Sequence, residues 1–432
     1  MVVTWSQTAG RSGKHRGRRP RHAGASLAAI LALTLSAPPG LAHEDAAEVH
    51  NRAIILDTHV DIPLNWATDG LDPSQETRWQ VDLPKMRAGG MDAAFFVVYV
   101  PQGPRTPAGH AEAISTGFAR LAAIRRMTDD LARDSMGLAV SAYDVVRLHR
   151  EGKHAALIGI ENGYALGGNI DLLDIYYDYG VRYLGLTHNG HNELADSAIP
   201  KPEYGDEAEL HGGLSELGRA AIRRANALGV IVDISHASME TTLQAAALSQ
   251  APIIASHSSV ASLRPHPRNL TDEALKAIAE TGGVVNIVAF DTYLHEVDEE
   301  KFTSLLQIRQ DMGLSMEWVA QASEEDWQTY RARVDALNAK YPLAHIDALL
   351  DHIDYAVNLI GIDHVGIASD FGGGGGIDGW TDASETPALT QGLLGRGYNA
   401  QEIDKLLGGN MLRVLTTVER LAQKPNNTQE TE

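Results

Sequence analysis

The chain has 432 residues, of which 44% are hydrophobic and 21% are charged, and it contains no cysteine. This composition is typical of a globular protein with a large core and excludes a disordered chain. The formal net charge of −20 argues against nucleic acid and anionic membranes as partners, because an acidic surface repels phosphate groups. Without cysteine, disulfides, thiol catalysis and cysteine-ligated zinc are excluded.

The first 42 residues have the pattern of a secretory signal peptide. They hold six Lys and Arg residues and no acidic residue, followed by the apolar stretch 23–37 and by small residues up to Ala42. This is the order of a signal peptide, with cleavage expected near Ala42. The apolar stretch is shorter than the roughly 20 residues that a membrane span needs, so no stable membrane insertion is expected. An uncleaved anchor and a twin-arginine signal at Arg18-Arg19 are the alternatives. The pattern predicts a periplasmic or secreted protein.

Eight apolar runs alternate with helical patterns along the rest of the chain. They cover residues 54–62, 93–100, 155–160, 181–187, 229–235, 251–256, 283–289 and 364–369. Continuous apolar runs are typical of parallel strands that are covered on both faces. Eight alternations favour an α/β fold, a single (β/α)8 TIM-type barrel, over an open doubly wound sheet. No glycine-rich phosphate loop follows the first run, which argues against nucleotide binding.

The helices between these runs carry clear start and stop signals. One is expected to begin after Ser215 and to end at Gly229, and another to begin after Thr271. The long connections 101–154 and 291–363 are expected to hold helical insertions on the barrel, the first a loop and two helices. The predicted organisation is a signal peptide over 1–42, one barrel domain over 43–424 and a disordered tail over 425–432.

Side chains that bind metals stand where predicted strands end. They are His59, Asp61, Glu161, His236 and His257, with Asp370 after the last run. In a parallel barrel these ends meet on the face that carries the active site. A lone histidine is usually a surface or core residue, and His154, His345 and His364 are interpreted in this way. Combined imidazoles and carboxylates instead predict two divalent ions, with zinc expected, that share a bridging carboxylate as in hydrolases.

Several segments together resemble the membrane (renal-type) dipeptidase family, one of the metal-dependent amidohydrolase-like barrels. The resemblance extends from about residue 53 to about residue 422. It depends on the segments DTHVD, IGIENG, RYLGLTHNG, GLSELGRAAIRRANALGVIVDISHAS, APIIASHSS, RPHPRN and GIDHVGIASDF, which occur in this order. It implies that His59 and Asp61 bind one metal and that His236 and His257 bind the other. Glu161 would then bridge the two ions.

The resemblance also implies roles for three residues around the metals. His188 would polarise the scissile carbonyl or stabilise its oxyanion. Arg268 would bind the terminal carboxylate of the substrate, for which a guanidinium offers a bidentate fork. Asp370 would accept a proton from the water that bridges the metals, which leaves a hydroxide, and would pass this proton to the leaving amine. A carboxylate beside two cations stays ionised and suits this role.

Other pocket features are less specific. Trp66, Asn192 and Tyr293 are candidate pocket residues, although packing would explain them equally well. The glycine run Gly372–Gly376 is either a mobile loop beside the substrate or sequence drift, with drift slightly favoured. This run and the insertion 291–345 are expected near the pocket.

These observations predict an exported metal-dependent dipeptidase that cleaves small dipeptides, including those with a D-residue at the C-terminal position. The resemblance suggests a homodimer. One alternative is an enzyme with the same binuclear site that hydrolyses a different bond, that of an N-acyl-amino acid, a lactone or a β-lactam. Another is a non-catalytic periplasmic binding protein.

Overall fold

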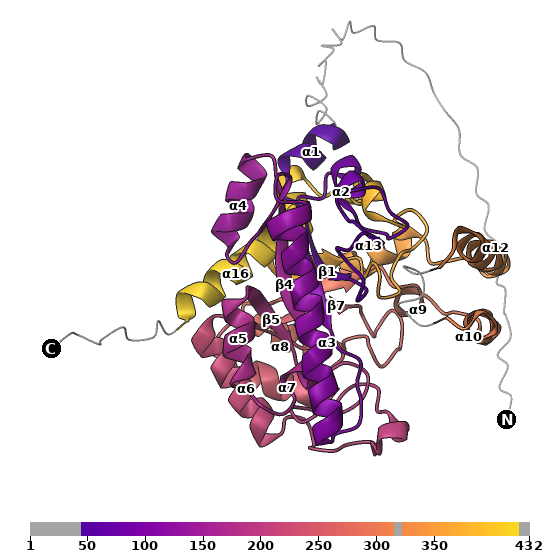
Figure 1. Ribbon diagram of the computed structural model, residues 1–432. Coiled ribbons are helices and arrows are strands. Elements are labelled where there is room, and N and C mark those ends of the chain that lie inside the picture. The colour runs from indigo at the N-terminus through magenta and orange to yellow at the C-terminus, as the bar shows by residue number, and fades with distance from the viewer. Residues whose placement is uncertain (1–44, 315–321, 423–432) are drawn as a thin grey trace, which may run out of the picture. The chain divides into compact units, whose positions relative to one another are not determined.

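The computed structural model describes residues 45–314 and 322–422. Within these residues one parallel sheet has the strand order β1-β2-β4-β5-β6-β7-β8-β9, and helices surround it (Figure 1). The strands are β1 (Leu56–Asp61), β2 (Ala93–Tyr99), β4 (His154–Glu161), β5 (Val181–Gly185), β6 (Ile231–Asp233), β7 (Ile254–Ser258), β8 (Val284–Val288) and β9 (Val365–Ala368). All eight correspond to predicted runs.

The sheet closes on itself beside the end of β1. The Asp370 N–H donates to His59 O at 3.1 Å, and the Asp61 N–H donates to Phe371 O at 2.8 Å. These bonds join the segment after β9 to β1, and the predicted (β/α)8 barrel is confirmed.

Both faces of the strands are buried, which explains the continuous apolar runs. In β2, Phe95 packs inside the barrel with Leu157 and Tyr183, whereas Phe96 packs in the outer cluster with residues of the helices. Alternate side chains therefore serve two cores, one within the barrel and one between barrel and helices.

The helices around the barrel follow the expected punctuation. They are α3 (Pro107–Arg126), α4 (Ala142–Arg150), α5 (Leu172–Asp178), α6 (Glu216–Leu228), α7 (Met239–Leu248), α8 (Asp272–Glu280), α13 (Ile346–Ile360) and α16 (Asn410–Leu421). Further helices are α1 (Ala46–Arg52), α2 (Leu83–Gly89), α14 (Pro387–Gly395) and α15 (Ala400–Asp404). Ser215 caps α6 by accepting the Gly218 N–H, and Thr271 caps α8 in the same way. The predicted starts of both helices are confirmed.

Both long connections are helical, with one addition. The first holds α3 and α4 but also β3 (Met136–Leu138), which pairs with the start of β4. The two expected helices are present, whereas the strand was not expected, because three residues are too few to show a periodic pattern.

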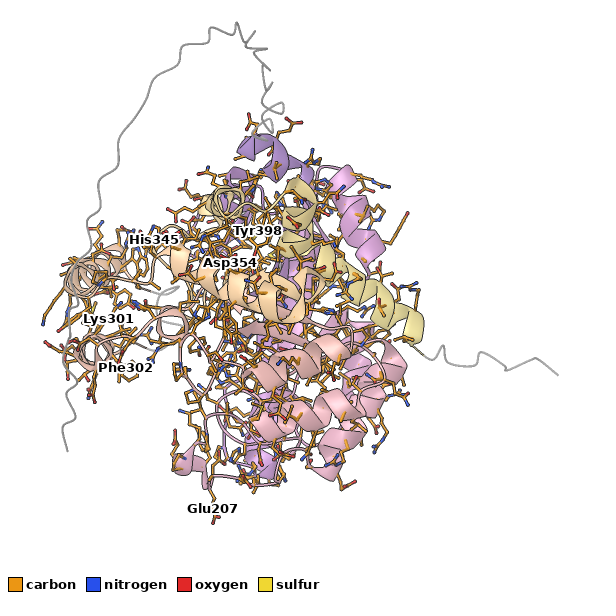
Figure 2. All side chains as sticks on the ribbon, turned by 180° about the vertical axis from the view of Figure 1, so that it is seen from behind. Glu207, Lys301, Phe302, His345, Asp354 and Tyr398 are labelled. Carbon is orange, nitrogen blue, oxygen red and sulfur yellow. The ribbon has the colours of Figure 1, made fainter. Side chains whose placement is uncertain are left out.

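The second connection holds α9 (Asp291–Leu294), α10 (Glu299–Met312), α12 (Glu324–Lys340) and α13. Helices α10 and α12 lie together beside the barrel (Figure 1), joined by the ion pair of Arg333 with Asp311 at 2.8 Å. Lys301 of α10 (Figure 2) reaches back to Asp291 Oδ2 at 2.7 Å, which ties the insertion to the end of β8.

The expected signal peptide (1–42) and the region after Ala422, which includes the expected tail (425–432), lie outside the described residues. Among residues 45–314 and 322–422, no helix combines the length and apolar character required to cross a membrane.

Candidate active site

The carboxyl ends of the strands bring the predicted metal ligands into one cluster. All are between 0% and 5% exposed: His59, Asp61, Glu161, His236 and His257. The first two lie in β1, Glu161 ends β4, His257 lies in β7 and His236 follows β6. Burial of this many polar groups is costly unless they are paired or coordinate metals.

Glu161 lies at the centre of this cluster. Its Oε2 is 3.4 Å from His59 Nε2, whereas its Oε1 is 3.2 Å from His236 Nε2 and 3.6 Å from His257 Nε2. The two oxygens of one carboxylate therefore face different histidines. This arrangement suits a carboxylate that bridges two ions.

Two further carboxylates, those of Asp61 and Asp370, lie near His59. The Asp61 Oδ2 lies 3.5 Å from His59 Nε2, and Asp61, Asp370 and His59 form one of the groups whose ligand atoms lie within 4.8 Å of one another. Asp57, on the same strand, does not join them. Its Oδ1 accepts the backbone N–H groups of His59 and Ser369 instead.

The pKa shifts of these groups fit divalent cations. Burial lowers the pKa of His59, but the carboxylates of Glu161 and Asp61 outweigh this effect and raise that pKa well above its usual value, because a positive charge is favoured beside them. Burial, with nearby cationic groups adding to it, lowers the pKa of His236 and His257, so both rings are neutral and can act as ligands. Burial raises the pKa of Glu161 and Asp370 above the usual range, because charged carboxylates are poorly solvated there. The buried Nε2 of His59 has no hydrogen-bond partner in the described part of the chain. Dications would satisfy this nitrogen and stabilise the carboxylates, so the residues fit a binuclear metal site.

Hydrogen bonds behind the cluster aim the imidazoles at its centre. The Nδ1 atoms face outward: that of His59 is 3.1 Å from Tyr183 Oη, and that of His236 is 3.1 Å from Asn189 Oδ1. Such partners fix the ring orientation and leave Nε2 for the metal.

His257 is held by a buried relay. Its Nδ1 lies 2.8 Å from Ser256 Oγ, which donates to Asp233 Oδ2 at 2.6 Å. The sequence analysis missed Tyr183, Asp233, Ser256 and Asn189. The position of Asp233 at a strand end was a usable signal, but nothing in the sequence marked Tyr183.

The backbone is strained at three strand ends of the site. Asn162, His236 and Asp370 have φ values of 84°, 68° and 57°, and Ala67 is the other non-glycine residue with positive φ in the described ranges. Such conformations cost about 1–3 kcal/mol each and concentrate at functional sites. Here His236 and Asp370 belong to the groups of candidate ligands, whereas Asn162 caps the short helix after β4 by accepting the Tyr164 N–H.

His188 and Arg268, the two predicted substrate-binding residues, lie beside the candidate metal ligands. His188 Nε2 lies 3.7 Å from Glu161 Oε1, and burial, followed by the charge of Arg268, lowers the pKa of His188 to about 3. The ring is therefore neutral and can donate a hydrogen bond. Arg268 is 2% exposed and donates to His257 O at 3.1 Å, while its buried Nε has no hydrogen-bond partner among the described residues.

The candidate pocket residues divide into two groups. Tyr293 is at the site, with its ring 5.4 Å from the guanidinium carbon of Arg268. Trp66 is fully buried and its indole donates to Met127 Sδ at 3.3 Å, while the amide of Asn192 donates to Leu186 O at 2.8 Å. These two therefore pack beneath the site.

The histidines interpreted as unrelated to the metals make backbone contacts elsewhere. His154 Nδ1 lies 2.9 Å from Met91 O, and His364 Nδ1 lies 2.8 Å from Gly283 O. His345 (Figure 2) caps α13 by accepting the Asp347 N–H.

The glycine run after Asp370 is not sequence drift. A Cβ at Gly373 would overlap the carboxylate oxygens of Asp370 and Asp61, and a Cβ at Gly375 would overlap Ser369 O. Gly372, Gly374 and Gly376 have positive φ, which favours glycine. The slight preference for drift was therefore wrong, because every position in the run has a structural reason to be glycine.

Comparisons with known proteins identify relatives over most of this chain. The family model for membrane dipeptidase (peptidase family M19) matches residues 43–429. Dipeptidase aclJ of Aspergillus oryzae is 34% identical over 354 residues, which are 81% of this chain and 72% of that protein.

Solved structures have the same fold. The probable dipeptidase PvdM from Pseudomonas aeruginosa is 35% identical with a TM-score of 0.77, covering 88% of this chain and 99% of that chain. A metallopeptidase from Rhodobacter sphaeroides, liganded with a phosphinate mimic of the dipeptide L-Ala-D-Ala, has a TM-score of 0.66 and 24% identity over 85% of this chain and 99% of its own. The chain therefore belongs to the membrane dipeptidase family, peptidase family M19, and is a metal-dependent dipeptidase.

Proposed function

We propose that this dipeptidase hydrolyses small dipeptides with a free C-terminal carboxylate, including those with a D-residue at that position, and that it uses two zinc ions. The observation that carries the proposal is the position of Glu161, whose two oxygens face different histidines. The Rhodobacter protein with the same fold binds a mimic of L-Ala-D-Ala, which is a ligand of the proposed class.

The metals would be held by the residues described above. One pair of ligands is His59 with Asp61, the other is His236 with His257, and Glu161 is shared. Divalent ions held there would supply Lewis acidity, which polarises a peptide carbonyl and lowers the pKa of a bound water.

The surrounding side chains supply binding and proton transfer. Buried Arg268 binds the terminal carboxylate of the substrate, and the neutral His188 donates a hydrogen bond to the carbonyl oxygen as it becomes an oxyanion. Asp370 accepts the proton of the attacking water. As the new C–O bond forms and the peptide C–N bond breaks, Asp370 returns this proton to the leaving amine.

The substrate proposal is tested with a panel of L,L- and L,D-dipeptides, with zinc, cobalt or manganese supplied. N-acetylated amino acids, a lactone and a β-lactam serve as the comparison. We expect turnover of free dipeptides, fastest with two ions per chain. Turnover of the acylated amino acids or cyclic compounds without any dipeptide cleavage would overturn the proposed substrate class.

We also propose that the protein is exported and acts in the periplasm or outside the cell, and that it forms a homodimer. The basic and apolar pattern of residues 1–42 supports export. N-terminal sequencing of the mature protein should give a sequence that begins near residue 43, and an intact Met1 on the active enzyme would contradict cleavage.

Light scattering measures the oligomeric state. A monomer in solution would contradict the proposed homodimer.

A further inference from the structure

The five glycines Gly372–Gly376 let the backbone after β9 lie directly against the catalytic carboxylates. A Cβ at Gly373 would overlap both Asp370 Oδ1 and Asp61 Oδ2. At Gly372 it would come within 2.5 Å of Asp61 O and 2.8 Å of Trp79 Nε1. The loop therefore borders both carboxylates at van der Waals distance, where any other residue would displace them.

The side chain of Gln80 holds this loop in place. Its Oε1 accepts the Gly372 N–H at 2.9 Å, and its Nε2 donates to Gly375 O at 2.9 Å and to Thr381 O at 2.8 Å. A Cβ at Gly376 would lie 2.7 Å from Gln80 Nε2. The glycines thus make room for the carboxylates on one side and for Gln80 on the other.

Backbone contacts transmit this support to the two carboxylates. Asp370 O accepts the N–H groups of Gly373 and Gly375 at 3.1 and 2.8 Å, which stabilises the left-handed backbone of Asp370. The residue next to Gln80, Trp79, donates from its indole to Asp61 O at 2.9 Å. One short segment therefore contacts both the end of β1 and the loop after β9.

We propose that Gly373 and Gln80 are positioning residues: Gly373 limits the movement of the Asp61 and Asp370 carboxylates, and Gln80 fixes the loop that carries Gly373. This inference rests on the proposed role of Asp370 in proton transfer. Residues behind metal ligands typically change metal affinity or activity by about 10–100-fold when they are replaced, and a displacement of about 1 Å can cost a similar factor in rate.

The first test is Gly373→Ala, read out as metal affinity. The added methyl group should displace the Asp61 carboxylate, so competition with a chromogenic zinc chelator should show at least about a 10-fold loss of affinity. Gly395→Ala is the matched control, because a Cβ at Gly395 meets nothing within 4 Å and its φ is not positive. Gly373→Ala with the affinity of the control would overturn the role of Gly373.

The second test is Gln80→Met, which keeps the side-chain volume and removes all three hydrogen bonds. With zinc saturating, we expect kcat to fall about 10-fold while KM stays within about twofold, because Asp370 loses its position but Arg268 still binds substrate. Gln75→Met is the control, since Gln75 lies in the same segment, is exposed and bonds Ser74. If Gln80→Met keeps wild-type kcat and zinc affinity, the inference is wrong even if Gly373→Ala fails to fold.

These tests separate the inference from the proposed substrate. Zinc affinity is measured without substrate, and kcat can be followed on any compound that the wild-type enzyme turns over. Absence of dipeptide cleavage by the wild type would refute the proposed function, whereas unaltered variants would refute only the positioning roles.

Discussion

Glu161 lies between the two halves of the proposed metal centre, because its oxygens face His59 on one side and His236 on the other, at 3.4 and 3.2 Å. We predict that Glu161→Gln lowers the occupancy of both ions, since the amide removes a negative charge from between two dications. Elemental analysis of the purified variant measures this. Retention of two metals per chain together with near-normal turnover would show that Glu161 is not the bridge.

Replacing Asp370 distinguishes a role in proton transfer from a role in binding metal or substrate. Asp370→Asn keeps the size of the side chain but cannot accept a proton from water at neutral pH. We predict retained metal content, little change in KM and a fall of about 10²-fold or more in kcat. Steady-state kinetics with parallel metal analysis tests this. Loss of metal and stability together would indicate a structural carboxylate instead.

At the level of secondary-structure elements, a glycine in β4 leaves room for a tyrosine of β5 that contacts a histidine of β1. A Cβ at Gly159 of β4 would overlap the ring of Tyr183 in β5, whose hydroxyl orients His59. We predict that Gly159→Ala lowers the free energy of unfolding by about 1–3 kcal/mol through overpacking and weakens zinc binding as Tyr183 moves. Urea unfolding and chelator competition measure the two effects. A variant with wild-type unfolding and zinc affinity would show that the ring has room to shift.

Helix α13 carries a histidine that should make stability depend on pH. His352 Nδ1 accepts the Val260 N–H at 3.1 Å, and burial lowers the pKa of His352 from 6.5 to about 4. Below pH 6.5 the unfolded chain binds a proton at His352, whereas the folded protein binds this proton only near pH 4. Stability is therefore lost as the pH falls through this window, by about 3 kcal/mol.

Chelator-treated protein shows this effect without the contribution of metal release. Denaturant unfolding at pH 7 and pH 4.5 should give a smaller pH difference for His352→Gln than for the wild type. An equal difference in both proteins would assign the acid sensitivity to other groups.

At the scale of the whole molecule, the proposed metals would join strands that are distant in the sequence. The candidate ligands come from β1, β4 and β7 and from the loop after β6, so bound ions would stabilise the barrel as a unit. Free zinc at about 1,000 times its Kd would add about 4 kcal/mol. We predict that chelation lowers the Tm and that added zinc restores it. Identical melting curves with and without chelator would contradict this coupling.

The barrel and the places where its chemistry could lie were both predictable from the sequence. Strands buried on both faces must be apolar throughout, so runs such as 93–100 and 181–187 were visible without a structure. Helix caps such as Ser215 are local hydrogen bonds between near neighbours and were equally readable. Ligand candidates could be placed because parallel strands end on one face.

The contacts between individual atoms became known with the folded structure. Tyr183 and Ser256 look like ordinary strand residues until folding places them behind the histidines, and Asn192 resembles a pocket residue until its buried hydrogen bonds are known. The requirement for glycine at position 373 comes from Asp61, at the other end of the barrel sequence. Contacts between residues so distant leave no periodic or local pattern in the chain, and for that reason only the folded protein reveals them.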